Sequence, residues 1–296
     1  MKNNMFFSKY TFDNFVVGES NEFAYDMVLA VAEGTINPCY SPLYIYSKSG
    51  LGKTHLLHAV RQRVEEKYPD REVLYVVGNK LLDDLIYYIK QGNGKEFQKK
   101  YTSPDILLID DVQLLSGKPT VQEEVLHIYN TLREQGKLII ITSDKPVTEL
   151  YEVTDTLKTR FISGLQIEIK PPNKALRTEV LKIIATRLNV LLPDDVINYI
   201  AENVDSNIRQ LEGAVKIAMA YKNRYDKDID IESAKDIFNV FEANNVSAPH
   251  KIRYAEAVAV LTRTIETEAC CSEMRKELES AVRWLENFDE EHDDEP

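Results

Sequence analysis

The stretch SKSGLGKTH, residues 47–55, determines how the rest of the chain is interpreted. It contains the second half of the phosphate-binding pattern GxxxxGK[ST], but Ser47 occupies the position of the pattern's first glycine. The apolar run LYIY at residues 43–46 predicts a buried strand before it, and residues 54–66 have a helical pattern after it. Because the motif requires a strand before it and a helix after it, this context favours a phosphate-binding loop over a chance match.

The residue types of this loop indicate what each position does. Glycines let backbone N–H groups surround phosphates without a Cβ in the way, and the dipole of the following helix favours negative charge. We expect Lys53 to reach the β- and γ-phosphates and Thr54 to hold Mg²⁺ through its hydroxyl. Lys48 adds a second positive charge close to the phosphates. A serine at position 47 is compatible with the loop if its φ angle stays negative.

A second motif, LLIDDVQ at residues 107–113, ends an apolar run in two acids. Asp110 is expected to bind Mg²⁺ through water, and Asp111 to orient or deprotonate the attacking water. The alternative is that an aspartate here caps the turn that follows. Two acids after four apolar residues favour catalysis over capping.

The order of apolar runs and helical patterns predicts an α/β fold with a parallel sheet and crossover helices. Strands are expected at residues 43–46, 72–77, 105–110 and 137–144, with an edge strand at 165–170, and helices at 54–66, 81–90 and 121–135. After Pro171 and Pro172 the helical patterns are at residues 174–188, 193–203, 207–222 and 231–241. We therefore predict an α/β nucleotide-binding domain over residues 1–172, a helical domain over 173–245 and an acidic helical extension over 246–296.

Composition limits the classes of protein that the chain can belong to. Its 296 residues include no apolar run long enough to span a bilayer, and its N-terminus lacks the pattern of a secretory signal. The cysteines are Cys39, Cys270 and Cys271, which fits a reducing compartment and indicates neither a disulfide framework nor a metal cage. We expect a cytoplasmic protein without membrane contact.

Negative charge is concentrated at the C-terminal end of the chain. The formal net charge is −12, and residues 230–296 contain 17 acidic and 7 basic side chains. Such a segment repels a phosphate backbone, which argues against duplex DNA binding through it. The preferred explanation of the acidic run is a solvated tail that aids solubility. Two apolar stripes in residues 258–288 fit a pair of amphipathic helices that either pack on the chain or bind a partner.

Taken with the residues around them, these motifs resemble the AAA+ ATPase domain of the bacterial replication initiator DnaA. The similar segments follow the family's order and are YTFDNFVVGESNEFAY (10–25), GLGKTHLLHAV (50–60), ILLIDDVQLLSGK (106–118), QEEVLHIYNTL (122–132), IIITSDKP (139–146), LKTRFISGL (157–165) and SNIRQLEGAV (206–215). The resemblance implies an AAA+ P-loop fold, with the helical domain as a lid over the nucleotide.

The resemblance also implies site residues and cofactors. Asp144 matches sensor 1 near the γ-phosphate, Arg160 an arginine finger presented to a neighbouring subunit, and Arg209 the sensor 2 residue of the lid. We expect ATP or ADP to be bound by Val16, Val17, Ser49, Gly50, Leu51, Gly52, Lys53, Thr54, His55 and Arg209. The residues expected to act in hydrolysis are Asp110, Asp111, Asp144, Arg160 and Arg209, and those expected to hold Mg²⁺ are Thr54 and Asp110. Without the surrounding motifs, a surface ion pair would be the preferred explanation of both Arg160 and Arg209.

The chain departs from the family at several points. Ser47 and Lys48 replace glycines, and Thr156 stands where the family often carries an arginine four residues before the finger. Only about nine residues precede the match, and nothing after Asn245 resembles a helix-turn-helix or GGRDHTTV. We expect the family's N-terminal and DNA-binding domains to be missing, and with them the usual recognition of duplex DNA.

A contact with single-stranded DNA is a weaker expectation. Lys118 and the helix around residues 79–89 match positions that hold one strand in the family, but Asp83 and Asp84 make that helix less attractive to phosphate. An exposed lysine in a loop explains Lys118 equally well.

These observations predict a DnaA-like ATPase that binds and hydrolyses ATP to control the assembly or activity of a DNA replication initiation complex. Its partner through Arg160 would be another copy of itself or a DnaA-type initiator. One alternative is a non-hydrolysing scaffold that binds a partner, and ATP turnover separates the two. A further alternative is a single-stranded-DNA-binding initiator of an unusual replicon, which predicts salt-sensitive DNA binding with ATP.

Overall fold

The computed structural model describes residues 10–205, 207–225 and 228–235. The chain divides into two compact units, residues 1–229 and 230–296. Of the second unit, only residues 230–235 are described, and residues 231–235 are helical. The rest of the predicted helix at 231–241 and the apolar stripes at 258–288 lie outside the described residues.

The first unit is built on a five-stranded parallel sheet in the order β2-β3-β4-β1-β5. The strands are β1 Leu43–Tyr46, β2 Val73–Val77, β3 Ile106–Asp110, β4 Leu138–Ser143 and β5 Leu165–Glu168. All five predicted strands are confirmed, with ends within two residues of those expected, and β5 lies at an edge of the sheet.

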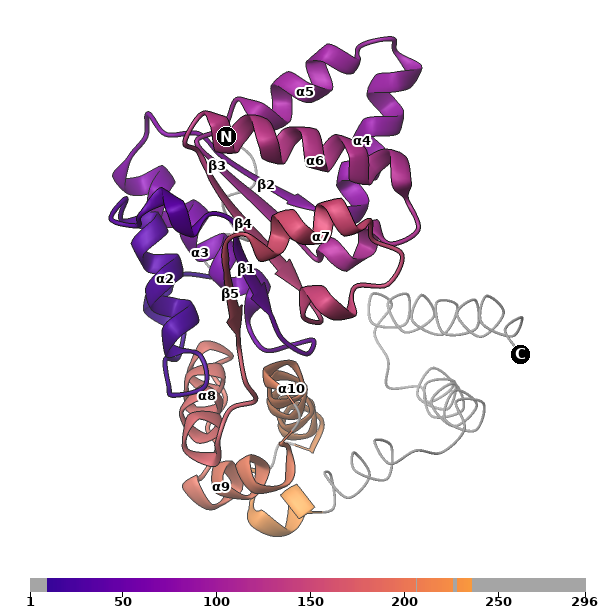
Figure 1. Ribbon diagram of the computed structural model, residues 1–296. Coiled ribbons are helices and arrows are strands. Elements are labelled where there is room, and N and C mark those ends of the chain that lie inside the picture. Colours follow the sequence, from indigo (N-terminus) through magenta and orange to yellow (C-terminus); the bar gives the residue numbers. More distant parts are fainter. Residues whose placement is uncertain (1–9, 206, 226–227, 236–296) are drawn as a thin grey trace, which may run out of the picture. The chain divides into compact units, whose positions relative to one another are not determined.

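Helices cover both faces of the sheet (Figure 1). Those of the α/β part are α2 Glu22–Ala32, α3 Lys53–Lys67, α4 Gly78–Lys90, α5 Gly94–Thr102, α6 Pro119–Glu134 and α7 Asp155–Ile162. Short 3₁₀ helices are η1 Phe12–Asn14, η2 Pro38–Tyr40, η3 Val112–Leu115 and η4 Val147–Glu149. The helical patterns at residues 54–66, 81–90 and 121–135 correspond to α3, α4 and α6, whereas α2, α5 and α7 were not predicted.

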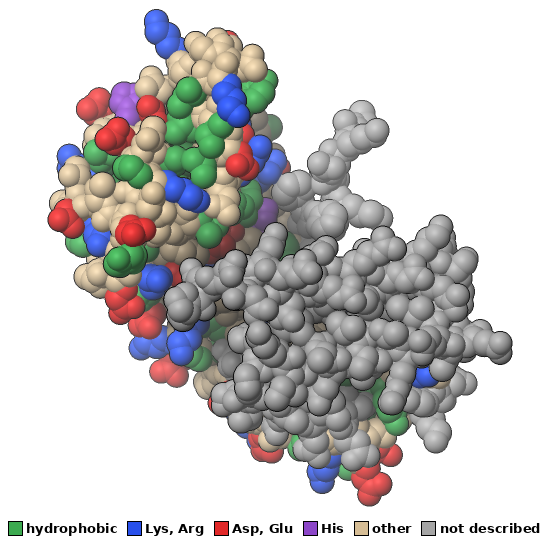
Figure 2. All heavy atoms as spheres, turned by 90° about the vertical axis from the view of Figure 1, so that its right-hand side faces the viewer, with side chains coloured by type: hydrophobic (Ala, Val, Ile, Leu, Met, Phe, Trp, Pro, Cys, Tyr) green, Lys and Arg blue, Asp and Glu red, His purple; other side chains and the backbone are tan. Residues whose placement is uncertain are grey.

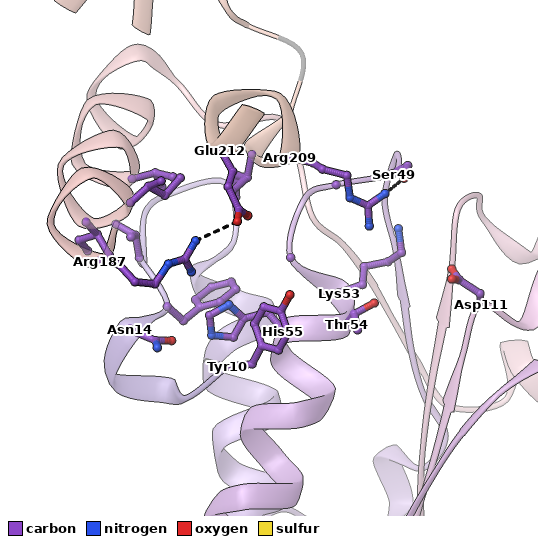
Figure 3. A pocket seen from close by; sticks show the side chains of 18 residues that line it. Tyr10, Asn14, Ser49, Lys53, Thr54, His55, Asp111, Arg187, Arg209 and Glu212 are labelled. Carbon is purple, nitrogen blue, oxygen red and sulfur yellow. Dashed lines mark hydrogen bonds and ion pairs between the residues drawn. The ribbon is translucent and has the colours of Figure 1, made fainter. Parts of the chain in front are cut away.

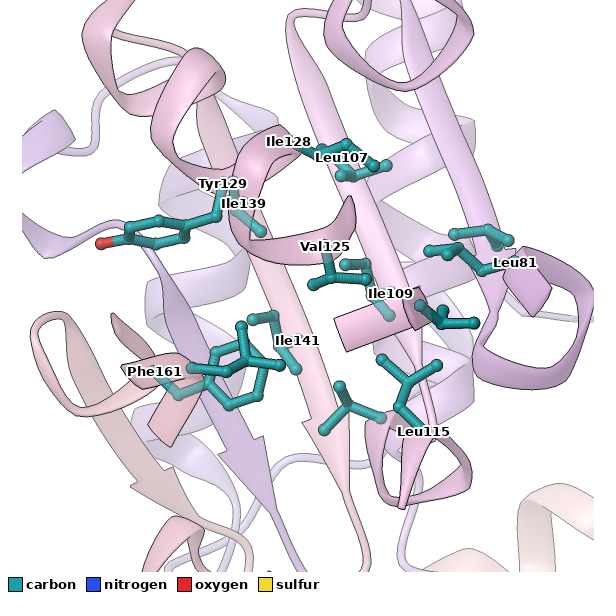
Figure 4. Packing of buried hydrophobic residues seen from close by; sticks show 14 of the residues in the cluster. Leu81, Leu107, Ile109, Leu115, Val125, Ile128, Tyr129, Ile139, Ile141 and Phe161 are labelled. Carbon is teal, nitrogen blue, oxygen red and sulfur yellow. The ribbon is translucent and has the colours of Figure 1, made fainter. Parts of the chain in front are cut away.

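The two faces of the sheet hold separate hydrophobic clusters. Leu107, Ile109 and Ile141 lie in one cluster with residues of α4 to α7 (Figure 4). Leu108 and Ile140 lie in the other cluster, with residues of α2 and α3. Because both faces are covered, the residues of β3 are all buried, which explains its uninterrupted apolar sequence.

Three helices follow Pro171 and Pro172: α8 Lys174–Arg187, α9 Asp194–Asn203 and α10 Ile208–Tyr225. Asn173 caps α8, since its side chain accepts a hydrogen bond from the N–H of Leu176 at 2.9 Å. The predicted helices at 174–188, 193–203 and 207–222 are therefore confirmed. Across the described ranges of the chain, none of the helices is both long and apolar enough to cross a membrane.

The parallel sheet brings distant motifs to one edge. The carboxyl end of β1 leads into the loop of residues 47–52, and β3 ends at Asp110. The register pairs Ile109 with Ile141, which places Asp110 beside Thr142 on β4. Parallel strands collect functional residues at their carboxyl ends, and the loop, the acids and the end of β4 meet there.

Candidate nucleotide-binding site

The loop between β1 and α3 has the backbone shape that its glycines allow. Gly50 and Gly52 have φ angles of 79° and 101°, in the left-handed region that favours glycine. Ser47 is not among the non-glycine residues with positive φ, which are Asp111, Glu152 and Asn189 within the described part of the chain. The φ angle of Ser47 therefore lies outside the left-handed region, as a serine at this position requires.

Neighbouring segments approach the loop closely. A Cβ added at Gly52 would lie 2.9 Å from Cε2 of Phe15, and one added at Gly50 would lie 2.9 Å from Oδ1 of Asn207. The first contact comes from the N-terminal segment and the second from the start of the lid. Glycine is required at both positions for space as well as for φ.

Lys53, at the start of α3, is only 6% exposed. Its Nζ donates to the carbonyl oxygen of Ser47 at 2.7 Å, to Oγ of Ser47 at 3.2 Å and to the carbonyl oxygen of Lys48 at 3.3 Å. Burial lowers the pKa of Lys53, and the carboxylates of Asp111 and Asp110 oppose that shift. The ammonium group is thus held against the first two residues of the loop.

Asp110 is 2% exposed, and hydroxyls from three elements donate to its carboxylate. Oδ2 accepts hydrogen bonds from Thr54 and from Tyr75, each at 2.8 Å, and Oδ1 accepts one from Thr142. Burial and the adjacent Asp110 carboxylate raise the pKa of Tyr75, so its hydroxyl keeps the proton that it donates. The hydroxyl of Thr54 and the carboxylate of Asp110 are therefore in direct contact, and both are oxygen donors of the kind that Mg²⁺ prefers.

Asp111 follows in the left-handed conformation, with φ 55° and ψ 59°. Its N–H donates to Oγ1 of Thr142 at 3.0 Å, and its Oδ1 accepts from Nε2 of Gln113 at 3.0 Å. Oε1 of Gln113 in turn accepts from the N–H of Asp144 at 3.2 Å. Asp111 occupies the N-cap position of η3, but its side chain makes no capping hydrogen bond, so capping does not account for it.

A cavity of about 260 Å³ connects this loop with the lid (Figure 3). Its lining residues are Tyr10, Asn14, Phe15, Val16, Ser49, Gly50, Gly52, Lys53, Thr54, His55, Asp111, Val180, Ile183, Ile184, Arg187, Ile208, Arg209 and Glu212. Lys53 and Arg209 provide positive charge at one end (Figure 3). Phe15, Val16 and apolar side chains of α8 provide a hydrophobic surface elsewhere in it.

The lid contacts the loop directly. Nη1 of Arg209 donates to Oγ of Ser49 at 3.1 Å, and the N–H of Ile208 donates to the carbonyl oxygen of Gly50 at 3.0 Å. Within the lid, Nη2 of Arg187 and Oε1 of Glu212 form an ion pair at 3.2 Å between α8 and α10 (Figure 3). The angle of the lid is therefore tied to the conformation of the loop.

The structure brings most of the predicted site residues to this cavity. Those lining it are Val16, Ser49, Gly50, Gly52, Lys53, Thr54, His55, Asp111 and Arg209, and Asp110 contacts Thr54 beside it. The side chain of Leu51 packs in a hydrophobic cluster, and Val17 is 41% exposed. Asp144 is exposed at the end of β4, and Arg160 lies in the last turn of α7.

Sequence reasoning missed several residues that shape the site. The two acids are oriented by hydrogen bonds from Tyr75, Thr142 and Gln113. Each of these bonds crosses the sheet or a turn, so no periodic pattern in the sequence indicates it. Asn21 fixes the segment around Val16, because it donates to the carbonyl oxygen of Val16 at 2.9 Å and accepts from the N–H of Gly18 at 2.8 Å. The lid residues that line the cavity from α8 are 180, 183, 184 and 187, a helical spacing that could have indicated a face toward the ligand.

Comparisons with known proteins agree with this geometry. Residues 6–168 match the family model described as the bacterial DnaA ATPase domain. The chromosomal replication initiator protein DnaA of Symbiobacterium thermophilum is 44% identical over 233 residues, which cover 77% of this chain and 51% of that protein. The chain thus spans about half the length of the curated relatives that it matches.

Solved structures show the same relationship. The crystal structure of domain III of Thermotoga maritima DnaA is 42% identical, with a TM-score of 0.74, and the match covers 79% of this chain and 97% of that one. A structure of the replication initiator DnaA bound to AMPPCP and single-stranded DNA is 29% identical, with a TM-score of 0.67, and the match covers 91% and 79% of the two chains.

Two substitutions at Thr142 test the arrangement of the acids. Thr142→Val should lower the free energy of unfolding by about 2–5 kcal/mol, because a buried carboxylate oxygen loses a donor and the N–H of Asp111 loses its acceptor. Thr142→Ser keeps the hydroxyl and should cost only about 1 kcal/mol for the lost methyl group. Urea denaturation followed by circular dichroism measures both values, and equal losses in the two variants would contradict the hydrogen bonding described above.

Proposed function

Because the chain belongs to the bacterial DnaA family of AAA+ ATPases, we propose that it binds ATP between the loop and the lid and hydrolyses it. The nucleotide state would then control the assembly or activity of a DNA replication initiation complex. The proposal rests mainly on one observation: Lys53 and Thr54 at the start of α3 and Arg209 of the lid line a single cavity, and Asp110 of β3 contacts Thr54 beside it.

The residues present fit a nucleotide and its metal. Phosphates would contact Lys53 and backbone N–H groups at the start of α3, where the helix dipole favours negative charge. The base would lie toward Val16 and the apolar face of α8. Mg²⁺, held by Thr54 and Asp110, would neutralise charge on the phosphate oxygens.

Asp111 is the proposed base for the attacking water. Gln113 holds one of its carboxylate oxygens, and the second is left for a proton from water at the cavity that Asp111 lines. The amide of Gln113 has one favourable orientation, because a flip would place its NH₂ group against the N–H of Asp144 and its oxygen against the carboxylate. Gln113 therefore serves as a positioning residue for the base.

The arginine finger requires a second chain. Arg160 does not line the cavity of its own chain, and Leu157 and Phe161 beside it are fully buried. Its Nε is buried without a hydrogen-bond partner among the residues described. We propose that Arg160 completes the site of a neighbouring copy or of a DnaA-type initiator, where it would stabilise charge on the transferred phosphate.

The scaffold alternative has less support. The bonds from Thr54, Tyr75 and Thr142 to the buried carboxylate of Asp110 stabilise the fold in either case. The orientation of Asp111 by Gln113 at the cavity has a use in hydrolysis that a scaffold lacks. This contact favours hydrolysis, and a turnover measurement tests it.

Single-stranded DNA binding is the weaker candidate function. It is suggested by the structure of a related replication initiator DnaA bound to AMPPCP and single-stranded DNA. Nζ of Lys118 already donates to Asn79 at 3.1 Å and to the carbonyl oxygen of Leu114 at 2.8 Å. On the face that carries α4, hydrophobic side chains gather in the upper part, with both basic and acidic side chains among them (Figure 2). The described residues of this upper part show no continuous basic groove of the kind that tracks a strand (Figure 2).

ATP turnover tests the proposed function. The wild-type protein with Mg²⁺ should release phosphate, and Asp111→Asn should lower the rate by about 100-fold or more, because the water loses its base. The affinity for ATP should change by less than about threefold, since the two side chains have the same size and make the same contacts. Because the proposal has a neighbour's arginine complete the site, the assay is repeated with a DnaA-type initiator added. Absence of turnover in both assays, despite ATP binding, would favour the scaffold alternative.

A mixing experiment tests the role of Arg160. Arg160→Ala has an intact base but no finger, and Asp111→Asn has a finger but no base. If the finger acts between chains, an equimolar mixture should hydrolyse ATP faster than either variant alone, by about tenfold or more. A mixture no faster than the average of the two variants would show that Arg160 does not act on a neighbour.

A further inference from the structure

The hydrogen bonding of Lys53 leaves none of its N–H groups for a phosphate. A lysine ammonium has three N–H donors and no acceptor. In this structure three oxygens accept from Nζ of Lys53: the carbonyl oxygens of Ser47 and Lys48 and the hydroxyl of Ser47. The side chain is buried, so these oxygens replace the water that an exposed lysine would have.

One of these acceptors departs from the phosphate-binding pattern. The hydroxyl of Ser47 donates its own proton to the carbonyl oxygen of Lys48 at 3.0 Å, so its lone pairs are available to Lys53 at 3.2 Å. The GxxxxGK[ST] pattern has a glycine at this position, and a glycine has no hydroxyl. With a glycine, the two carbonyl oxygens would remain and one N–H of Lys53 would be free to bind a phosphate.

We propose that Ser47 is an affinity-setting residue of the nucleotide site, whose hydroxyl competes with the phosphates for Lys53 and weakens the binding of ATP and ADP alike. A phosphate oxygen must displace this hydroxyl from the ammonium group before it receives a full hydrogen bond. The inference rests on the proposed nucleotide site but concerns its strength rather than its existence. A weaker site exchanges nucleotide faster, since such affinity differences are mostly differences in dissociation rate.

The backbone at Ser47 should keep its conformation when the hydroxyl is removed. Ser47 is 4% exposed, and its N–H donates to the carbonyl oxygen of Ser143 at 3.2 Å, which continues the pairing of β1 with β4. Its backbone φ is not in the left-handed region, so both alanine and glycine are compatible with it. Removing the hydroxyl therefore changes the partners of Lys53 and leaves the path of the chain in place.

Isothermal titration calorimetry on the whole protein, Ser47→Ala and Ser47→Gly tests this inference, with ATP, ADP and adenosine as probes. Both variants should bind ATP and ADP about tenfold more tightly than the wild-type protein, the equivalent of one hydrogen bond to a charged group. Adenosine has no phosphate, so its affinity should be the same in all three proteins. Two variants are used because alanine removes the hydroxyl alone, whereas glycine restores the residue of the pattern.

The outcomes separate this inference from the proposed function. Unchanged or weaker binding of ATP and ADP in both variants overturns the role of Ser47 and leaves the nucleotide site intact. An equal gain for adenosine also overturns it, because the effect would not involve phosphate. If the two variants bind ATP and the wild-type protein does not, the inference is supported, and the wild-type site is too weak for the proposed function. No binding by any of the three proteins overturns both.

Discussion

The buried carboxylate of Asp110 is the group on which the site depends. It is 2% exposed and lies at the end of the fully buried strand β3, between β2 and β4, where an uncompensated charge would be costly. Donors from α3, β2 and β4 converge on it through Thr54, Tyr75 and Thr142. These bonds fix the start of the helix that carries Lys53, and they connect the phosphate loop to the strand that ends beside Asp144. The two motifs therefore form one hydrogen-bonded unit, and the position of each acid follows from the packing of the sheet.

The lid joins this unit through few and weaker contacts. Arg209 contacts Ser49, and Ile208 contacts Gly50, so each contact is a single hydrogen bond at the surface of the loop. Bonds of this kind contribute about 1 kcal/mol each, which a phosphate group can readily outweigh. Such an arrangement fits the proposal that the nucleotide state changes the angle of the lid. The serine hydroxyls of the loop thus contact two cations of the cavity, Lys53 through Ser47 and Arg209 through Ser49.

The features that the sequence predicted are those that leave a local signal. The five strands are short apolar runs, and the loop and the paired acids follow them directly, so fold and motif support each other. What the sequence could not show depends on distant partners. Helix α5 begins at Gly94, a residue that does not favour helices. The helix is supported by the packing of Phe97 and Tyr101 in the core, which the sequence does not show. Asp84 was expected to repel phosphate, but it is buried and paired with Lys80 and Lys100, and Tyr101 donates to it. Thr142 has no pattern of its own, because its role exists only when β4 lies beside β3.

The most direct test of the account is the affinity of the purified protein for ATP with Mg²⁺, compared with that of Lys53→Ala, by titration calorimetry. Lys53 lines the cavity, and its Nζ donates to the carbonyl oxygen of Ser47 at the start of the loop. We expect saturable binding by the wild-type protein and a loss of about 100-fold or more in the variant, since a buried charge that contacts phosphate is removed. Equal affinity in the two proteins would contradict the account, because the nucleotide would then bind somewhere other than the loop that Lys53 occupies.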